Sequence, residues 1–450
     1  MHQYRDKYDI VVVGGGTGGA PAAIAAGRNG ASVLLIEKNG FLGGLTTGGL
    51  VTPWPHWLAR HSWQDFKEPY VEGIHTEILG RLQRLGGLAE DGRTWNEEVL
   101  KYVLEQMCLE AGVHLLFHSF VFRLSKDVRQ IKSLDIANKS GLRSVSGNIF
   151  VDGTGDADLM ALAGIECKKG RETDGATQPM TTVFRLGGVD TKKFPGFSPF
   201  QYLRGSRWVE QREMPDEIAN IHREYLEARK RGEITNPRVE LHWMPHSQPG
   251  VLHFNATRVQ GLDATRAEDL TDAEIQGKRQ VIEIVNFLRR FPSFADAYVS
   301  QMGSDVGVRE TRRIIGHYVL TDEDVLSGRK FPDGIARGHG PIDIHDPTEP
   351  SSSIQLAFCP DYTSYDIPYR CLVPKEIENI LIGSRCVSAT HEAFASVRLI
   401  PQVSAIGQAA GTAAALAHQG SVSVQQLDVD LLRAALKEQG ASIWEEGMPG

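Results

Sequence analysis

Cysteine is scarce in this 450-residue chain, and long apolar runs are missing. The five cysteines are odd in number and widely spaced: Cys108, Cys167, Cys359, Cys371 and Cys386. Such spacing excludes a disulfide framework and favours a reducing compartment. No apolar run approaches the ~18 residues of a membrane span. Because segment 1–9 is too polar for a signal peptide, we expect a cytoplasmic protein without a membrane span.

The chain also lacks an excess of basic residues. Lysine and arginine number 48 against 56 acidic residues, which gives a net charge of −8. This balance argues against a nucleic-acid partner, whose phosphates require a basic face. With 41% hydrophobic and 23% charged residues, the composition is that of an ordinary globular protein. The length predicts two or three domains.

What the sequence does contain is a glycine motif near its start. Gly14, Gly16 and Gly19 follow the apolar run 10–13 at G-x-G-x-x-G spacing, and Glu37 closes the next apolar run. The three glycines allow a tight turn, the close approach of a pyrophosphate and close packing of a helix on a strand. Phosphates then meet the positive end of a helix dipole. The motif therefore predicts a dinucleotide site, with the ribose hydroxyls on the Glu37 carboxylate.

The rest of the chain suggests one nucleotide-binding domain interrupted by a second domain. We expect helices or strands at 99–110, 115–124, 146–151, 217–231, 251–259, 272–290, 380–382, 401–417 and 424–439. Charged helices and strands with aromatic residues fill the middle, and the buried-strand pattern returns near 380. The predicted division is a first part of the dinucleotide-binding domain at 1–174, a substrate or cap domain at 175–370, and a closing part of the dinucleotide-binding domain at 371–450.

Only one complete dinucleotide fingerprint is present. The segment 153–155 lacks the third glycine, and the segment 338–340 has no strand–helix context. One dinucleotide therefore has a dedicated site. Glu37 and the late return of the nucleotide-binding pattern fit FAD better than NAD.

These motifs resemble a known family. Segment 14–37 with Gly43 and Gly44 is similar to the FAD-binding start of the glutathione-reductase-type flavoprotein superfamily, and segment 151–158 to its second FAD-contacting strand end. Segment 379–415 resembles the closing motif of bacterial FAD-dependent oxidoreductases, distant relatives of fumarate reductase flavoproteins. Shorter matches lie at 254–258, 307–313 and 367–370. The resemblance covers essentially the whole chain.

The resemblance implies FAD, oxidoreductase chemistry and an α/β fold. We expect a discontinuous, three-layer, Rossmann-like FAD-binding domain with an inserted α+β domain. The expected cofactor-binding residues are Gly14, Gly16, Thr17, Gly19, Glu37, Lys38, Gly43, Gly44, Thr46, Val121, Gly153, Thr154, Gly155, Asp156, Arg385, Leu399 and Ile400.

The closing helix offers a second cofactor contact. Pro401 suits the first turn of a helix, so the amides of Leu399 and Ile400 are expected to point to what lies before it. By resemblance, that is the N1–C2=O edge of the flavin. Arg398 adds a cation there, which would raise the reduction potential of the flavin. The alternative is that Arg398 forms a salt bridge.

Three further positions are candidates for chemistry or are set aside. His391 precedes the closing helix and could act as an acid, a base or a substrate anchor; the alternative is a structural histidine. Arg309, with Arg312 and Arg313, could bind a carboxylate, or pair with Glu310. No metal is expected. The Asp343–Asp346 segment has one histidine among short-spaced acids, which is a weak metal signal.

Two minor expectations concern other side chains. Asn255 and Arg258 are three residues apart on an expected strand, so they should face opposite sides and not share a pocket. His56 and Trp57 follow the glycine-rich loop and could approach the flavin, although packing is the more ordinary role.

The sequence thus predicts catalysis by an FAD-dependent dehydrogenase or reductase. No cysteine lies in 41–49, which argues against a disulfide reductase. A hydride would pass between flavin N5 and a small organic substrate, which would be anionic if the arginines bind it. His391, Arg309 and Arg398 are the expected catalytic residues, with a separate electron donor or acceptor. A flavin oxidase or monooxygenase that uses O₂ and a non-catalytic FAD-binding or sensing protein remain open.

Overall fold

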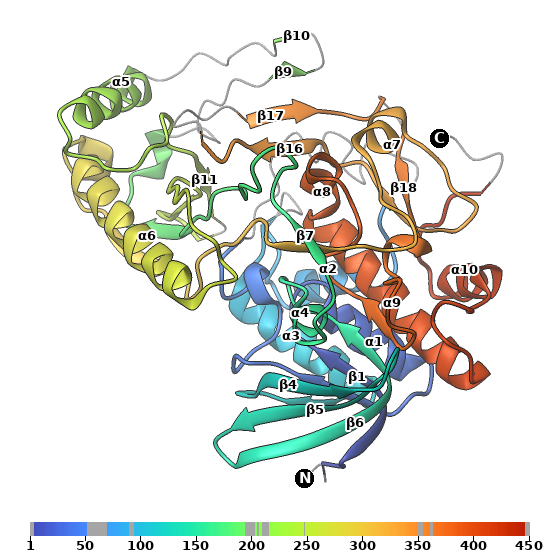
Figure 1. The fold of residues 1–450 in the computed structure, drawn as a ribbon. Coiled ribbons are helices and arrows are strands. Elements are labelled where there is room, and N and C mark those ends of the chain that lie inside the picture. The colour runs from blue at the N-terminus through green and yellow to red at the C-terminus, as the bar shows by residue number, and fades with distance from the viewer. Residues whose placement is uncertain are drawn as a thin grey trace.

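A seven-stranded sheet lies in the lower part of the computed structural model as Figure 1 draws it, near the N-terminus. The structure describes residues 4–51, 70–89, 94–193, 203–204, 207–208, 216–246, 248–348, 354–360 and 363–445. The strand order is β3-β2-β1-β6-β5-β4, with β19 also paired to β6. The strands are β1 (Lys7–Val13), β2 (Val33–Ile36), β3 (His114–Leu116), β4 (Phe120–Lys126), β5 (Ile131–Asn138), β6 (Gly141–Asp152) and β19 (Ile380–Ile382).

Strand β6 joins the two ends of the chain. Its last residues pair in parallel with β1 on one side and with β19 on the other, so Val151 lies between Val12 and Leu381. Its first residues pair with β5 in an antiparallel hairpin. The carboxyl ends of β1, β6 and β19 therefore meet at one edge of the sheet, where loops of parallel sheets bind ligands.

Helices α1 (Gly19–Arg28) and α9 (Ile400–Gly420) pack closely together on this sheet. A side chain at Gly407 would bring a Cβ within 2.0 Å of the Gly18 carbonyl oxygen, and one at Gly411 within 2.0 Å of the Ala22 carbonyl oxygen. The small residues of α9 are required because its backbone contacts that of α1.

The remaining helices surround these layers. They are α2 (Ile74–Arg84), α3 (Glu97–Glu110), α4 (Asp158–Leu162), α5 (Asp216–Lys230), α6 (Ala267–Leu288), α7 (Asp322–Ser327), α8 (His391–Val397) and α10 (Val429–Glu438). Helices α2 and α3 pack on each other near α1 and α9. Among the described residues, no helix has the length and apolar character needed to cross a membrane.

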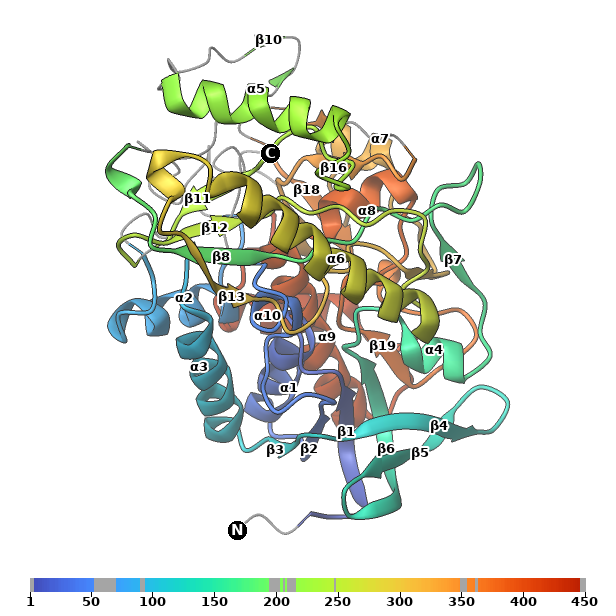
Figure 2. The same cartoon turned by 90° about the vertical axis from the view of Figure 1, so that its left-hand side faces the viewer.

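A second sheet carries the middle of the chain. Its order is β11-β12-β8-β13, and Figure 2 shows α5 and α6 beside it. Its strands are β8 (Phe184–Gly187), β11 (Trp243–Pro245), β12 (Leu252–Phe254) and β13 (Tyr298–Met302). Phe184 and Phe254 stack at 4.8 Å between ring centroids in a separate core, with Trp243 beside them. This core holds the second sheet to its helices.

Four two-stranded pairs complete the fold. They are β7 (Cys167–Lys169) with β14 (Arg312–Ile314), β9 (Leu203–Arg204) with β10 (Arg207–Trp208), β15 (Gly334–Gly338) with β18 (Tyr365–Pro368), and β16 (Ile342–His345) with β17 (Ile354–Ala357). Ile314, Phe331 and Tyr365 belong to the same core as the seven-stranded sheet, while the second core lies within 184–297. The division at 174 and 370 stays a prediction.

Two expectations about elements were wrong in detail. The strand expected at 251–259 ends at Phe254, because the amide of Asn255 donates to the His242 carbonyl oxygen (3.0 Å) and the chain then leaves the ladder. The helix expected from 424 begins at Val429. His391 precedes the closing helix as expected, and it is the first residue of helix α8.

Candidate functional site

The turn between β1 and α1 is closed by backbone contacts on one side and open on the other. Gly14 has a φ of +87°, and an added Cβ there would lie 2.9 Å from the Gly153 backbone. A Cβ at Gly19 would lie 1.8 Å from the Gly14 carbonyl oxygen. At Gly16, by contrast, the nearest protein atom to an added Cβ is 3.9 Å away. The turn therefore leaves space for a ligand at Gly16.

A second glycine-rich turn lies against the first. The amide of Gly43 donates to the Gly15 carbonyl oxygen (2.8 Å), and a Cβ at Gly44 would come within 3.0 Å of the Gly16 Cα atom. The hydroxyl of Thr46 donates to the Gly43 carbonyl oxygen (2.8 Å), which holds the turn. Two segments that are distant in sequence thus present adjacent backbones.

Glu37 is buried at the end of β2, with both of its carboxylate oxygens anchored. Oε2 accepts from the Gly15 amide (2.7 Å), and Oε1 accepts from the Asn39 amide (2.8 Å). Burial raises the pKa of Glu37 above its ordinary value, and the two amides oppose that rise. Each oxygen of a carboxylate has further lone pairs that can accept ligand hydroxyls.

Arg385 brings a cation to the same sheet edge. Its guanidinium contacts Asp156 (3.1 Å), and it lies where a side chain on Gly155 would be, 2.8 Å from an added Cβ. Within the described part of the chain, its Nε atom is buried without a hydrogen-bond partner. A buried guanidinium N–H without a partner is costly, so an anion at this place would complete the site.

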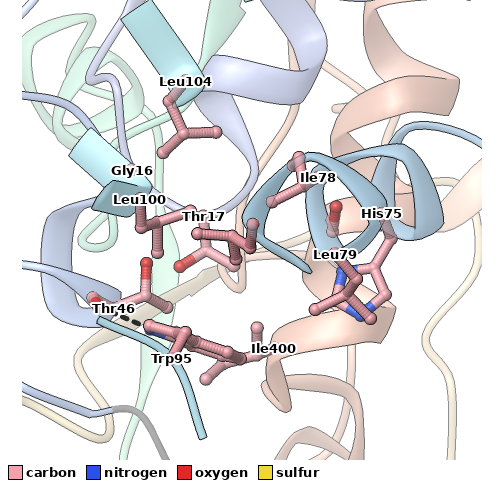
Figure 3. A pocket seen from close by; sticks show the side chains of 12 residues that line it. Gly16, Thr17, Thr46, His75, Ile78, Leu79, Trp95, Leu100, Leu104 and Ile400 are labelled. Atoms are coloured by element: carbon pink, nitrogen blue, oxygen red, sulfur yellow. Dashed lines mark hydrogen bonds between the residues drawn. The ribbon is translucent and has the colours of Figure 1, made fainter. Parts of the chain in front are cut away.

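A cavity adjoins the turn (Figure 3). It lies between α2, α3 and the start of α9, and the indole of Trp95 donates to the Thr46 carbonyl oxygen (3.2 Å). The lining residues are Gly16, Thr17, Thr46, His75, Ile78, Leu79, Leu82, Trp95, Leu100, Leu104, Ile400 and Ser404. Among the described atoms, the buried Ser404 hydroxyl has no partner. The cavity is thus apolar, with a few polar groups where the glycine turn meets α9.

Arg398 lies just before α9 and faces the β16 strand. Its guanidinium donates to the Asp343 carbonyl oxygen (2.9 Å) and carboxylate (3.2 Å), and contacts the Gln178 side-chain oxygen at 3.4 Å. Burial lowers the pKa of Arg398, and the Asp343 charge opposes that shift. The amide of Leu399, expected to point away from the helix, donates to the Ser396 carbonyl oxygen (3.3 Å).

His391 is buried in an ion network at the start of α8. Its Nδ1 atom lies 2.9 Å from the Glu310 carboxylate, which also binds the Arg313 guanidinium. Arg313 donates further to the carbonyl oxygens of Ala389 (3.0 Å) and Gly170 (2.8 Å). Because an ionised carboxylate only accepts, Nδ1 is the donor, and Nε2 of the neutral ring carries the lone pair.

The three arginines of 309–313 do not form one cluster. Arg309 donates to the Pro179 carbonyl oxygen (2.7 Å) and the Thr181 hydroxyl (2.6 Å). Arg312 donates to the Asp156 carbonyl oxygen (2.8 Å), in the loop that follows β6. Arg313 pairs with Glu310, as the alternative for this run expected, whereas carboxylate binding by Arg309 stays a prediction.

Sequence reasoning missed several polar residues here. Gln178 connects the His391 network with Arg398. Its backbone amide donates to the Glu310 carboxylate (3.1 Å), and its side-chain oxygen accepts from the His345 backbone amide (3.3 Å) and from Arg398. Glu310 had been considered only as a partner of the arginines, and Asp343 only as a weak metal ligand. No local pattern marks Gln178, because its partners come from distant segments.

The structure brings most of the expected cofactor residues together. The Gly14–Gly19 turn, Gly43–Thr46, Glu37, Gly153–Asp156 and Arg385 meet at the sheet edge, and Leu399 and Ile400 begin the adjacent α9. Val121 lies in β4, two residues after Ser119, whose amide donates to the Glu37 carbonyl oxygen (3.0 Å). Lys38 is exposed beside Glu37. His56 and Trp57 lie outside the described residues.

The argument that separated Asn255 from Arg258 fails, because no strand continues through them. The Asn255 carbonyl oxygen accepts from Arg238 (2.9 Å), and Arg258 reaches the Asp346 carbonyl oxygen (2.5 Å). Arg258 therefore belongs to a group of arginines, and the Asn255 carbonyl oxygen accepts from another member of that group.

Residues 9–436 match the family described as FAD dependent oxidoreductase. The match spans nearly the whole chain, so the protein belongs to this family. It is an FAD-dependent oxidoreductase with a Rossmann-like α/β fold.

Curated relatives match over short regions. A nicotine dehydrogenase of Pseudomonas putida is 36% identical over 96 residues, 19% of this chain and 19% of the relative. A 3-oxosteroid 1-dehydrogenase of Mycobacterium tuberculosis is 33% identical over 112 residues, 24% of this chain and 20% of the relative. These matches thus span about a fifth of each relative. A geranylgeranyl bacteriochlorophyll reductase-like protein of Thermoplasma acidophilum aligns with a TM-score of 0.46 and 12% identity, over 96% of this chain and 84% of that chain.

The residues at the sheet edge fit FAD. The open side of Gly16 and the unpartnered Nε of Arg385 suit a pyrophosphate, while the anchored Glu37 carboxylate suits ribose hydroxyls. The unpartnered Ser404 hydroxyl at the start of α9 gives a further polar contact. These are the groups that would hold the cofactor.

Proposed function

We propose that this enzyme is a dehydrogenase or reductase of a small organic substrate. Bound FAD would accept a hydride from, or donate one to, a substrate carbon at its N5 atom. His391 would move the accompanying proton, and Arg309 and Arg398 would hold an anionic group of the substrate. The relatives named as dehydrogenases support this reaction class.

One observation carries the proposal: a chain of hydrogen bonds links His391 to Arg398. Arg398 donates to the Gln178 side-chain oxygen (3.4 Å), and the backbone amide of Gln178 donates to the Glu310 carboxylate (3.1 Å). The same carboxylate accepts from His391 (2.9 Å). A fixed cation and a proton-transfer group are thus held in one network beside the start of α9. Such a pair would serve both substrate binding and proton transfer.

The hydrogen bond to Glu310 determines how His391 would act. Because Nδ1–H is committed to the carboxylate, only Nε2 can take a proton from the substrate. The protonated ring could return that proton from Nε2 in the reverse direction, with Glu310 stabilising its charge. Glu310 would therefore orient His391 without touching the substrate.

Four finer assignments are also proposals. The order of the glycine turn, Glu37 and the closing helix supports placement in the glutathione-reductase-type superfamily, with distant kinship to fumarate reductase flavoproteins. The scarcity of cysteine supports a cytoplasmic location. The two cores support an inserted domain within 175–370. A separate electron donor or acceptor would complete the cycle.

Anaerobic photoreduction of the FAD-loaded enzyme tests the reaction class. We expect organic acceptors with activated double bonds or carbonyl groups to reoxidise the flavin, followed by its absorbance. His391→Gln should slow reoxidation by roughly 10²–10⁴-fold while leaving bound flavin unchanged. Rapid reoxidation by O₂ alone would instead support an oxidase or monooxygenase. Reoxidation by no acceptor and no O₂ would support a binding protein.

A further inference from the structure

Four arginines from four separate segments gather beside the start of α9, two of them buried and two partly exposed. Isolated backbone bridges join two of these segments through residues 180 and 181: Met180 pairs with Val259, next to Arg258, and Thr181 pairs with Gly307, two residues before Arg309. We call this group the arginine quartet: Arg238, Arg258, Arg309 and Arg398.

Three arginines of the quartet donate to uncharged acceptors, and the fourth donates to a carboxylate. Arg238 donates to the Asn255 carbonyl oxygen (2.9 Å), and Arg258 to a backbone carbonyl oxygen of β16's following turn. Arg309 donates to a carbonyl oxygen and a hydroxyl. Within the described ranges, only Arg398 has an ion pair with a carboxylate, that of Asp343 at 3.2 Å. The charges of Glu240, Asp346 and Glu310 act on Arg238, Arg258 and Arg398 from a greater distance, without an ion pair in the described part of the chain.

Donor groups of the quartet lack partners. The Nε atoms of Arg238, Arg258 and Arg398 are buried with no hydrogen-bond partner among the described residues. The side-chain amide nitrogen of Gln178, which contacts Arg398 through its oxygen, is in the same condition. Four buried donors without acceptors indicate a missing oxyanion, because each unmet donor costs free energy.

The charges of the quartet act on one another. Burial is the first cause that lowers the pKa of Arg309 well below its ordinary value, and the positive charges of Arg398, Arg238 and Arg258 lower it further. The Asp343 charge opposes this shift. Bringing an anion to the quartet would relieve this repulsion.

The same side chains keep some access to solvent. Arg309 and Arg398 are partly exposed although burial lowers the pKa of each. His242 is also partly exposed, and burial lowers its pKa to about 3. The partial exposure of Arg309 and Arg398 leaves a side from which a small ligand could reach them.

We propose that the arginine quartet and Gln178 form the substrate subsite of this oxidoreductase for a small organic ligand that carries two negative charges. This inference rests on the proposed function only in calling the ligand a substrate. Two carboxylates, or one phosphoryl group, have the required charge and acceptor number. The four donor groups left unmet by the described residues match the acceptor number of a dianion better than that of a monoanion.

Titration of the oxidised, FAD-loaded enzyme tests the charge requirement without turnover. The probes are malonate, succinate and inorganic phosphate, with acetate and neutral succinamide as comparators, at constant ionic strength. Binding is followed by the change in flavin absorbance and by calorimetry. We expect at least one dianion to bind roughly tenfold or more tighter than acetate, and succinamide to give no change. Tightest binding by phosphate would indicate a phosphoryl group, and tightest binding by succinate or malonate two carboxylates.

Substitutions test the residues. Arg258→Gln and Arg238→Gln should each weaken the dianion by roughly ten- to hundredfold in Kd, with the FAD content unchanged. Arg279→Gln, on the exposed face of α6, is the matched control and should leave Kd unchanged. If the buried variants do not fold, the salt dependence of Kd for the unmodified enzyme still reports the charge, because a dianion should show a steeper dependence than acetate.

Equal binding of acetate and the dianions, or no binding by any anion, would overturn the proposal. These outcomes are separate from the proposed reaction. If the enzyme binds dianions but no organic acceptor reoxidises its reduced flavin, the subsite proposal is supported and the proposed reaction is contradicted. If the enzyme turns over neutral substrates and binds no anion, the proposed reaction is supported and the subsite proposal is contradicted.

Discussion

Replacing Gly16 with alanine separates a cofactor contact from a structural requirement. Gly16 does not have a positive φ, so its backbone accepts an alanine. The nearest protein atom to the added Cβ is 3.9 Å away, which is ordinary contact. We therefore expect the cofactor-free variant to be as stable as the unmodified protein, and the methyl group to occupy space that the pyrophosphate needs.

The expected loss falls on cofactor affinity. Overfilling a tight contact by one methyl group costs about 1–3 kcal/mol. At 1.4 kcal/mol per factor of ten, this corresponds to an increase of roughly 5- to 150-fold in the Kd for FAD. Fluorescence quenching during titration of the cofactor-free protein measures that Kd.

Gly19→Ala is the matched comparison in the same turn. Its Cβ would lie 1.8 Å from the Gly14 carbonyl oxygen, whereas ordinary contact begins at 3.4 Å, so the backbones must separate by about 1.6 Å. This variant should lose both FAD affinity and cofactor-free stability. The two proteins must be compared without FAD, because bound ligand itself raises the melting temperature.

Two results would refute this reasoning. If Gly16→Ala lowered the melting temperature of the cofactor-free protein as much as Gly19→Ala does, the open side of the turn would not be open. If Gly16→Ala bound FAD with unchanged Kd, the pyrophosphate would not lie against this glycine.

Three further outcomes are expected. Glu310→Gln should lower kcat roughly 10- to 100-fold with unchanged flavin content, because His391 loses its orienting carboxylate; unchanged kcat would exclude the orienting role. Glu97→Gln should lower the free energy of unfolding by about 3–5 kcal/mol in urea titrations, because it leaves the buried Arg185 guanidinium without its ion pair. Burial lowers the pKa of His75 to about 4, so below pH 6.5 the unfolded chain binds a proton that the folded chain refuses. The free energy of unfolding should therefore fall by up to about 1.4 kcal/mol per pH unit between pH 6.5 and 4, and His75→Gln should flatten that slope.

The sequence predicted the cofactor end of the fold because its signals are local. The β1–α1 turn is determined by glycines a few residues apart, and the small residues of α9 marked a helix that must pack closely. What they pack against could not be read from the sequence, since the contact of Gly407 with Gly18 joins the two ends of the chain.

The middle of the chain was predicted less well because tertiary hydrogen bonds replaced regular pairing. After Phe254, the Thr257 hydroxyl accepts from the Thr182 amide (2.8 Å) and donates to the Thr182 carbonyl oxygen (3.0 Å). An alternation of apolar and polar residues in the sequence cannot show that hydrogen bonds to a distant segment replace regular strand pairing. Helix α8 did leave a signal: Thr390 caps it by accepting from the Ala393 amide (3.2 Å).

The run of arginines at 309–313 shows why the substrate end resists prediction. Spacings of three and four residues would place these side chains on one face of a helix, where a single carboxylate could bind them together. The backbone instead becomes extended at β14, so the three directions diverge. Arg309 joins the quartet, Arg312 supports the loop at Asp156, and Arg313 holds Glu310 under His391. One short motif thus contributes to three parts of the molecule, and only the fold assigns each arginine to its part.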